Sequence, residues 1–258
     1  HENIMSCLKY SINFFLKGDE INKDAILEMG KEKIISYLPL NHIAAQMVDI
    51  YLSIAICSCV YICNMKQEKI PEVIKREEPT LFLGVPRIWE KIDEGIDKKL
   101  KNMSHIESIM FGICKNVPYL NKILLNKMGL GKCKLLYTAA APLNKSTRKS
   151  LEDKGIHLYD IYGMSETTGP MTISLPKVNK KGSVGKIIPN IEIKISDDES
   201  NKGEIMVKGK TVSSHYYNMT EREDEWMGTG DLGYIDKDGF LFLKGRSKDI
   251  IITSGGEN

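Results

Sequence analysis

The stretch Tyr162–Pro170 brings together side chains that could hold a nucleotide. The ring of Tyr162 offers a flat apolar face for a purine while its hydroxyl stays hydrogen-bonded, and Gly163 lets the backbone approach a ligand without an intervening Cβ atom. Ser165 could donate to a phosphate oxygen. Glu166 is a hard oxygen ligand suited to Mg²⁺, which takes one or two protein carboxylates and completes its coordination with water and substrate phosphate. The alternative is a plain polar turn, because Ser, Thr, Gly and Pro are common in turns.

Four further motifs accompany this stretch in a fixed order: Leu38–His42, Ala139–Leu143, Trp226–Asp231 and Leu243–Asp249. With these residues the chain resembles the AMP-forming acyl-CoA synthetases, members of the adenylate-forming superfamily that includes luciferases and peptide-synthetase adenylation domains. The resemblance covers nearly the whole chain. Three segments make it most similar to the bubblegum-type long-chain fatty acyl-CoA synthetases: Val85–Lys91, Tyr162–Glu166 and Gly255–Asn258.

The resemblance implies where the base of a nucleotide would lie. Ala140, Ala141 and Pro142 would line the adenine pocket, and Tyr162, followed by Gly163, would stack on the base.

The resemblance also implies contacts to phosphate, metal and ribose. Ser165 would meet the α-phosphate, and Glu166 would bind the metal. Asp231 would accept hydrogen bonds from both ribose hydroxyls, because a carboxylate is an acceptor with two oxygens. Arg246 would be a second ribose contact, since its guanidinium keeps its charge and presents donors in a fixed fork.

Two further catalytic positions follow from the resemblance. His42 would sit between the carboxylate of the acid substrate and its tail; an isolated histidine is more often a core or surface residue, but Leu38–Leu40 supplies the family context. Lys248 would lie at the pivot of a C-terminal domain, and a plain surface lysine is the alternative. An aromatic gate to the acyl tunnel is in doubt, because Ala44–Gln46 occupies that region.

The spacing Gly228–Gly233 also satisfies the dinucleotide-binding pattern of three glycines. That pattern has meaning only between a strand and a helix, where the helix N-terminus receives the pyrophosphate. Here residues 234–243 form two apolar runs around a turn rich in Asp and Gly. The sequence therefore predicts a β-hairpin at this position.

Hydropathy patterns predict an α/β fold with a mainly parallel sheet and flanking helices, followed by a small antiparallel β-subdomain. Short β-like runs alternate with helical ones from Ile34 to about Pro176, which favours parallel strands joined by helices. After Gly182 the runs alternate apolar and polar residues, which indicates antiparallel strands. We expect an α/β subdomain over 1–182, a β-subdomain over 183–244 and a hinge over 245–258.

Composition excludes several classes of protein. The 258 residues carry a net charge of +2 that is spread evenly, so we expect no nucleic-acid partner. Six cysteines without a CxxC pair favour reduced thiols in the cytoplasm. The longest apolar run, Ile50–Cys63, is shorter than the roughly 20 residues of a membrane span. It predicts a buried helix and strand, and peripheral membrane contact stays compatible with an oily substrate.

Parts of the family pattern lie outside the chain. It opens at His1 without Met, lacks the upstream Gly/Ser/Thr-rich phosphate loop, and stops at Asn258 before the small C-terminal domain that carries the adenylation lysine. We therefore expect an internal fragment of a larger synthetase, inactive alone. The link between Thr220 and Trp226 is also short for the family.

The leading hypothesis is that the parent protein is an enzyme of fatty acid metabolism, a long-chain fatty acid–CoA ligase. It would use ATP and Mg²⁺ to form acyl-AMP and then transfer the acyl group to coenzyme A. Two alternatives stay open: a non-catalytic binding module for nucleotide or fatty acid, and an adenylating enzyme whose acceptor is not coenzyme A.

Overall fold

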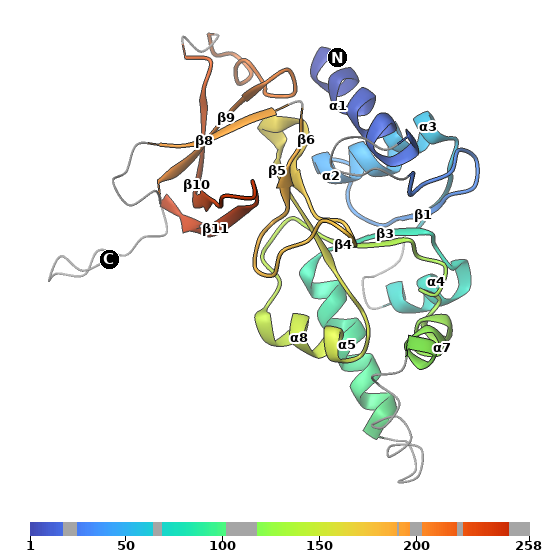
Figure 1. The fold of residues 1–258 in the computed structure, drawn as a ribbon. Helices are drawn as coiled ribbons and strands as arrows, with labels where there is room; N and C mark the ends of the chain where they lie inside the picture. The colour runs from blue at the N-terminus through green and yellow to red at the C-terminus, as the bar shows by residue number, and fades with distance from the viewer. Residues whose placement is uncertain are drawn as a thin grey trace, which may run out of the picture.

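The structure, a computed structural model, describes residues 1–17, 25–63, 69–101, 118–189, 191–196, 203–220 and 224–247. A seven-stranded sheet with helices on both faces forms one part, and a four-stranded sheet lies at its side (Figure 1). The expected α/β architecture followed by antiparallel strands is confirmed.

The larger sheet has the strand order β2-β1-β3-β4-β5-β6-β7. Its first five strands are parallel, and β6 and β7 add antiparallel pairs at one edge. Short apolar runs form the central strands, which are buried on both faces as parallel strands usually are. The bounds are β1 (Lys33–Ser36), β2 (Cys59–Ile62), β3 (Leu81–Gly84), β4 (Leu135–Thr138), β5 (Tyr159–Met164), β6 (Gly169–Ile173) and β7 (Lys186–Ile187).

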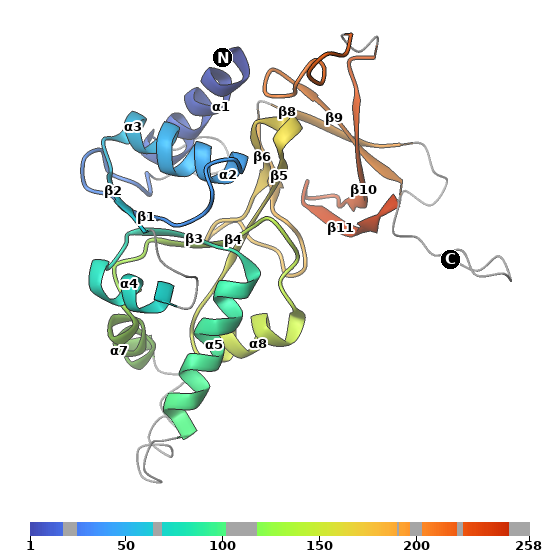
Figure 2. The same cartoon turned by 180° about the vertical axis from the view of Figure 1, so that it is seen from behind.

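Helices cover the two faces of this sheet in separate groups (Figure 2). One face carries α1 (Glu2–Ile12), α2 (Ile43–Ala45), α3 (Ser53–Ile56) and the π-helical segments η1 (Asn13–Lys17) and η2 (Gln46–Leu52). The other carries α4 (Ile70–Glu77), α5 (Pro86–Lys101), α7 (Pro118–Met128) and α8 (Lys145–Asp153). Each face has its own buried cluster of apolar side chains.

Helix α5 begins at Pro86, a residue that suits the first turn of a helix, and Trp89 fixes the position of the helix. This side chain is fully buried, and its indole Nε1 lies 3.1 Å from the carbonyl oxygen of Gly84 and 3.2 Å from that of Tyr137. The apolar body of the ring therefore fills the core while its polar atom bonds to two strands of the sheet.

The smaller sheet is antiparallel, with the order β11-β10-β9-β8. The predicted hairpin is confirmed, because Gly228–Gly233 lies inside a strand and a turn at Asp236–Gly239 joins it to the next one. Both sheets contribute side chains to one apolar cluster. The bounds are β8 (Ile191–Ile195), β9 (Glu204–Gly209), β10 (Met227–Ile235) and β11 (Leu241–Arg246).

One expectation differs from the structure. The run Ile50–Cys63 does form helix and strand, but Ile54 and Ile62 are 72% and 80% exposed, because β2 is the first strand of the sheet order and α3 turns one side outward. The expectation that the run is buried is therefore wrong.

Within the described residues, no helix is long and apolar enough to cross a membrane. The described cysteines, at positions 7, 57, 59, 63 and 133, are free, and Cys114 lies outside the described residues.

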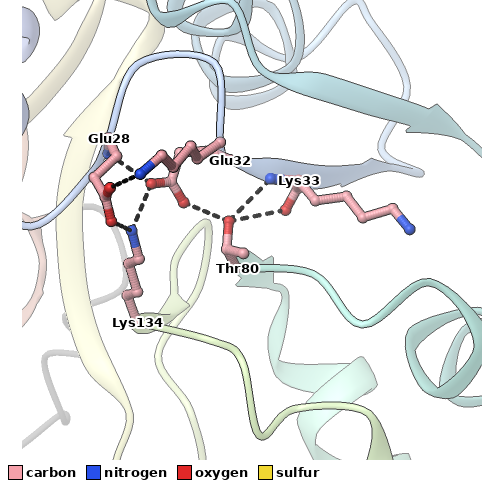
Figure 3. Close-up of polar contacts among 6 residues, drawn as sticks. Glu28, Glu32, Lys33, Thr80 and Lys134 are labelled. Carbon is pink, nitrogen blue, oxygen red and sulfur yellow. Dashed lines mark hydrogen bonds and ion pairs between the residues drawn. The ribbon is translucent and has the colours of Figure 1, made fainter.

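A polar cluster closes the amino-terminal edge of the parallel sheet (Figure 3). Glu32, Thr80 and Lys134 directly precede β1, β3 and β4. The side chain of Glu32 is fully buried and accepts hydrogen bonds from the Thr80 hydroxyl, from Lys134 Nζ at 2.7 Å and from the Glu28 amide at 2.6 Å. These donors compensate the buried carboxylate. The cluster therefore ties three strands together at the edge opposite their carboxyl ends.

Candidate nucleotide-binding site

Tyr162, Asp231 and Arg246 form one hydrogen-bonded cluster between the two sheets. The Tyr162 hydroxyl donates to Asp231 Oδ2 at 2.6 Å, and Arg246 Nε donates to Asp231 Oδ1 at 3.2 Å. Asp231 on β10 and Arg246 on β11 are cross-strand partners, whereas Tyr162 comes from β5 of the larger sheet. Three of the residues that the sequence singles out are therefore in direct contact.

An irregular part of β10 carries Asp231 toward this cluster. The pairing of β10 with β9 shifts register between Gly228 and Leu232. Within that interval Gly230 has φ +73°, a left-handed conformation that glycine adopts without steric cost. Thr229 Oγ1 accepts the Asp231 amide at 3.1 Å. The spaced glycines of this segment thus shape a strand irregularity rather than a strand-to-helix turn.

The electrostatics of the cluster keep the Tyr162 hydroxyl protonated. Burial raises the pKa of Tyr162 well above its usual value, and the hydrogen bond and charge of Asp231 raise it further. The phenol is therefore a donor throughout the neutral range. Each oxygen of Asp231 already accepts one hydrogen bond, and a carboxylate has about four lone-pair sites in all. The carboxylate can thus accept two ribose hydroxyls beside these contacts.

Ser165 and Glu166 follow β5 in the 3₁₀ turn η4 (Ser165–Thr167). Thr167 Oγ1 accepts the Met164 amide at 3.1 Å and donates to the Gly169 carbonyl oxygen at 2.8 Å. This bridge fixes the turn and leaves Ser165 exposed at the carboxyl end of the strand. Such ends are where open α/β sheets place ligands.

The packing of β5 against β6 requires a glycine at position 163, in addition to the place beside the nucleotide that is expected for Gly163. A Cβ atom at this position would lie 2.1 Å from the carbonyl oxygen of Gly169. The close approach arises where the pairing of β5 with β6 shifts register between Tyr162 and Gly163. A glycine here allows β6 to return alongside β5, and so helps to fix the turn that carries Glu166.

The expected adenine segment Ala140–Pro142 is an exposed turn directly after β4. Ala140 has φ +74°, which is uncommon for a residue with a Cβ atom. Such a conformation costs about 1–3 kcal/mol and clusters at ligand sites. Because β4 pairs in parallel with β5, this turn and the turn at Ser165 lie at the same edge of the sheet.

His42 lies at the same edge, after β1, and directly precedes α2 without a capping hydrogen bond from its side chain. Its amide donates to the Pro39 carbonyl oxygen at 3.0 Å, and its carbonyl oxygen accepts the Gln46 amide at 3.1 Å. The residue is exposed. In the described part of the chain, no hydrogen bond joins the His42 ring to the Tyr162 cluster. Lys248 lies outside the described residues, so its expected role stays a prediction.

The carboxylate ligand at this edge of the sheet suits a magnesium ion that nucleotide phosphate would also coordinate. Within the described ranges, no group of three His, Cys, Asp or Glu side chains is arranged to hold a metal ion. Mg²⁺ requires fewer protein ligands than such a group supplies, because one or two carboxylates suffice when phosphate and water complete its coordination. Glu166, at the carboxyl end of β5, supplies one such carboxylate.

One contact at the site has no signal in the sequence motifs. The Tyr216 hydroxyl donates to Glu166 Oε1 at 3.0 Å, although the two residues are 50 positions apart. Tyr216 lies after β9 of the smaller sheet, and only the docking of that sheet against β5 reveals the contact. Thr229, which lies within the Trp226–Asp231 motif, forms a side-chain hydrogen bond with Tyr162.

The chain belongs to the AMP-binding enzyme family, whose model matches residues 1–217. It is 36% identical over 260 residues to the long-chain-fatty-acid–CoA ligase ACSBG2 of Xenopus laevis, an alignment that covers 88% of this chain and 35% of the relative. It is 33% identical over 262 residues to the long-chain-fatty-acid–CoA ligase ACSBG1 of Homo sapiens, covering 90% and 36%. The expected family resemblance is confirmed, and the chain spans about a third of the length of these relatives.

Solved structures support the fold. Unliganded O-succinylbenzoate coenzyme A synthetase from Bacillus subtilis superposes with a TM-score of 0.69 at 24% identity, over 100% of this chain and 50% of that one. Apo MatB from Rhodopseudomonas palustris gives a TM-score of 0.71 at 24% identity, over 99% and 46%. Two further structures of the O-succinylbenzoate coenzyme A synthetase, one in complex with AMP and one with ATP and a magnesium ion, also match this chain with a TM-score of 0.69.

Proposed function

We propose that the complete protein is an ATP-dependent long-chain fatty acid–CoA ligase. In the first step a carboxylate oxygen of the fatty acid attacks the α-phosphorus of ATP, the bond to the β-phosphate oxygen breaks, and acyl-AMP and pyrophosphate form. In the second step the thiol sulfur of coenzyme A attacks the acyl carbon, the bond to the phosphate oxygen breaks, and AMP leaves. The thiol proton passes to solvent.

The observation that carries this proposal is the contact of Tyr162 and Arg246 with the Asp231 carboxylate, in a chain of the AMP-binding enzyme family. A fixed carboxylate beside an aromatic ring and a guanidinium suits a nucleoside, because the ring can pack on the base while the carboxylate accepts from the ribose. The fatty acid and coenzyme A enter the proposal through the named ligases that resemble the chain.

The remaining residues take roles around the reacting phosphate. Ser165 would donate to the α-phosphate, and Glu166 would hold Mg²⁺, which would neutralise charge that develops during adenylyl transfer. Ala140–Pro142 lines the adenine pocket. His42 lies between the carboxylate and the tail of the fatty acid. Lys248 is proposed as the pivot of a further domain, with 1–182 and 183–244 as the subdomains that precede the hinge.

Exchange of pyrophosphate into ATP tests the proposal. The complete protein is incubated with ATP, Mg²⁺, labelled pyrophosphate and one of acetate, octanoate, palmitate or a longer acid. We expect exchange that depends on the long-chain acids. Absence of exchange with every acid indicates a non-catalytic binding module. Exchange without thioester formation on addition of coenzyme A indicates a different acceptor.

A further inference from the structure

Glu166 is held by the segment that follows β9 of the smaller sheet. The hydroxyl of Tyr216 donates to Glu166 Oε1 at 3.0 Å, and the amide of Ser213 donates to the Glu166 carbonyl oxygen at 2.7 Å. The segment therefore contacts both the backbone and the carboxylate of this residue.

The segment is anchored independently of these two contacts. The Thr168 hydroxyl donates to the Thr211 carbonyl oxygen at 2.7 Å in a buried position. From helix α1, Asn3 Nδ2 lies 2.9 Å from the Lys210 carbonyl oxygen and 3.0 Å from that of Val212. Thr211 is fully buried, and Val212 is buried beside it. The backbone that leads to Tyr216 is thus fixed both to Thr168, directly after the turn at Ser165–Thr167, and to helix α1.

A fixed donor changes what a glutamate side chain can do. An unrestrained glutamate side chain loses rotamer freedom when it binds a ligand, and that loss opposes binding. A hydrogen bond to one carboxylate oxygen removes part of this freedom in advance and directs the other oxygen. Hydrogen bonds to charged groups are stronger than those between neutral groups.

We propose that Tyr216 is a positioning residue for Glu166, which it orients for binding the metal ion of the metal–nucleotide complex. The proposal rests on the function proposed above. The Tyr216 hydroxyl holds Oε1, and the other carboxylate oxygen would bind the metal ion. Loss of the hydroxyl then weakens binding of ATP with Mg²⁺ but leaves binding of AMP without metal unchanged.

Two phenylalanine variants of adjacent residues test this role in the complete protein. Tyr216→Phe removes the hydroxyl that contacts Glu166 and keeps the ring, which is 59% exposed. Tyr217→Phe makes the same chemical change at a side chain that is 92% exposed. Glu166→Gln serves as the reference for loss of the anionic ligand. Equilibrium dialysis measures the Mg²⁺ concentration that supports half-maximal ATP binding, without fatty acid so that no turnover occurs.

We expect Tyr216→Phe to raise this Mg²⁺ concentration about tenfold, Glu166→Gln to raise it at least as far, and Tyr217→Phe to match the wild type. AMP binding without Mg²⁺ should be equal in wild type and Tyr216→Phe. A titration of Tyr216→Phe that superimposes on a Mg²⁺-dependent wild type overturns the role of Tyr216 and leaves the proposed function standing. A lower Mg²⁺ requirement, or an equal loss of AMP binding, also overturns it. Absence of ATP binding by the wild type overturns both proposals.

Discussion

The hydroxyl of Tyr162 donates to the carboxylate of Asp231 at 2.6 Å, and these two residues join the seven-stranded sheet to the four-stranded sheet. The residues are 69 positions apart, on β5 and β10. Such a bond to a charged acceptor is stronger than one between neutral groups. The same pair therefore links the two sheets and presents an anionic acceptor beside an aromatic ring.

Replacing Asp231 with Ala should weaken binding of both AMP and ATP. The ribose hydroxyls would lose a charged acceptor, and hydrogen bonds to charged groups are worth about 1.5–3 kcal/mol, or roughly a tenfold to hundredfold loss of affinity. Isothermal titration of the complete protein measures this effect. Asp238→Ala, in the turn of the same hairpin, is the control and should bind AMP as the wild type does. Unchanged affinity in Asp231→Ala would remove this residue from the site.

Gly163→Ala should destabilise the fold, whereas Gly95→Ala should not. The new Cβ atom at position 163 would lie 2.1 Å from the Gly169 carbonyl oxygen, while nothing lies within 4 Å of one at position 95 inside α5. Overpacking typically costs about 1–3 kcal/mol, and alanine gains about 1 kcal/mol over glycine within a helix. Urea unfolding distinguishes the two variants. Equal stability of both would contradict the close approach of β5 and β6.

Glu32→Gln should lower the free energy of unfolding by about 2–3 kcal/mol. The buried carboxylate accepts a hydrogen bond from the charged Lys134 side chain. Removing one charge of a buried ion pair is destabilising, because the other charge is left uncompensated. Asp153→Asn provides a matched control, because its contact with Lys149 on α8 is exposed and 3.8 Å long. Such surface pairs contribute less than about 1 kcal/mol. If both variants unfold at the same denaturant concentration, the cluster at the amino-terminal edge does not stabilise the sheet.

Asp49 should make stability depend on pH in the mildly acidic range. It lines a cavity of about 10 Å³ between η2 and β1, and burial raises its pKa to about 6 although a hydrogen bond from Ser36 opposes the shift. Its pKa in the unfolded chain is about 3.9. The folded protein therefore binds more protons than the unfolded chain between about pH 4 and 6, and stability falls as pH rises through that window.

Comparison with Asp49→Asn isolates this effect, because asparagine does not ionise. One pKa unit corresponds to about 1.4 kcal/mol, and partial exposure of the side chain reduces the effect. The difference in unfolding free energy between variant and wild type should therefore change by about 1–2 kcal/mol in favour of the variant between pH 4 and 6. A difference that stays constant from pH 4 to 8 would show that Asp49 titrates normally in the folded protein.

Much of the fold follows from local patterns of apolar residues. The strands around Ile34, Leu81 and Leu135 are short apolar runs, and each forms a strand of the parallel sheet. The hairpin at 234–243 follows from its two apolar runs and from the turn residues between them, where Asp236 Oδ1 accepts hydrogen bonds from the amides of Asp238 and Phe240. These features depend on neighbouring residues, so one sequence is enough to predict them.

Features that depend on distant residues could not be predicted in this way. The exposure of Ile62 follows from the place of β2 in the strand order, which hydropathy does not encode. The same holds for Tyr216, whose contact with Glu166 requires the smaller sheet to dock on the larger one. The sequence motifs singled out Tyr162, Asp231 and Arg246, which the structure brings into contact, whereas Tyr216 is supplied by tertiary contact alone and was not predicted.

The fate of the carboxylate oxygens tests the proposed activation chemistry most directly. The complete protein is given a long-chain fatty acid with ¹⁸O in both carboxylate oxygens, together with ATP, Mg²⁺ and coenzyme A, and the products are analysed by mass spectrometry. Attack of the carboxylate on the α-phosphorus transfers one labelled oxygen to AMP. We predict AMP with one ¹⁸O atom and acyl-CoA that retains the other. Unlabelled AMP, or ADP in place of AMP, would contradict the proposed acyl-adenylate.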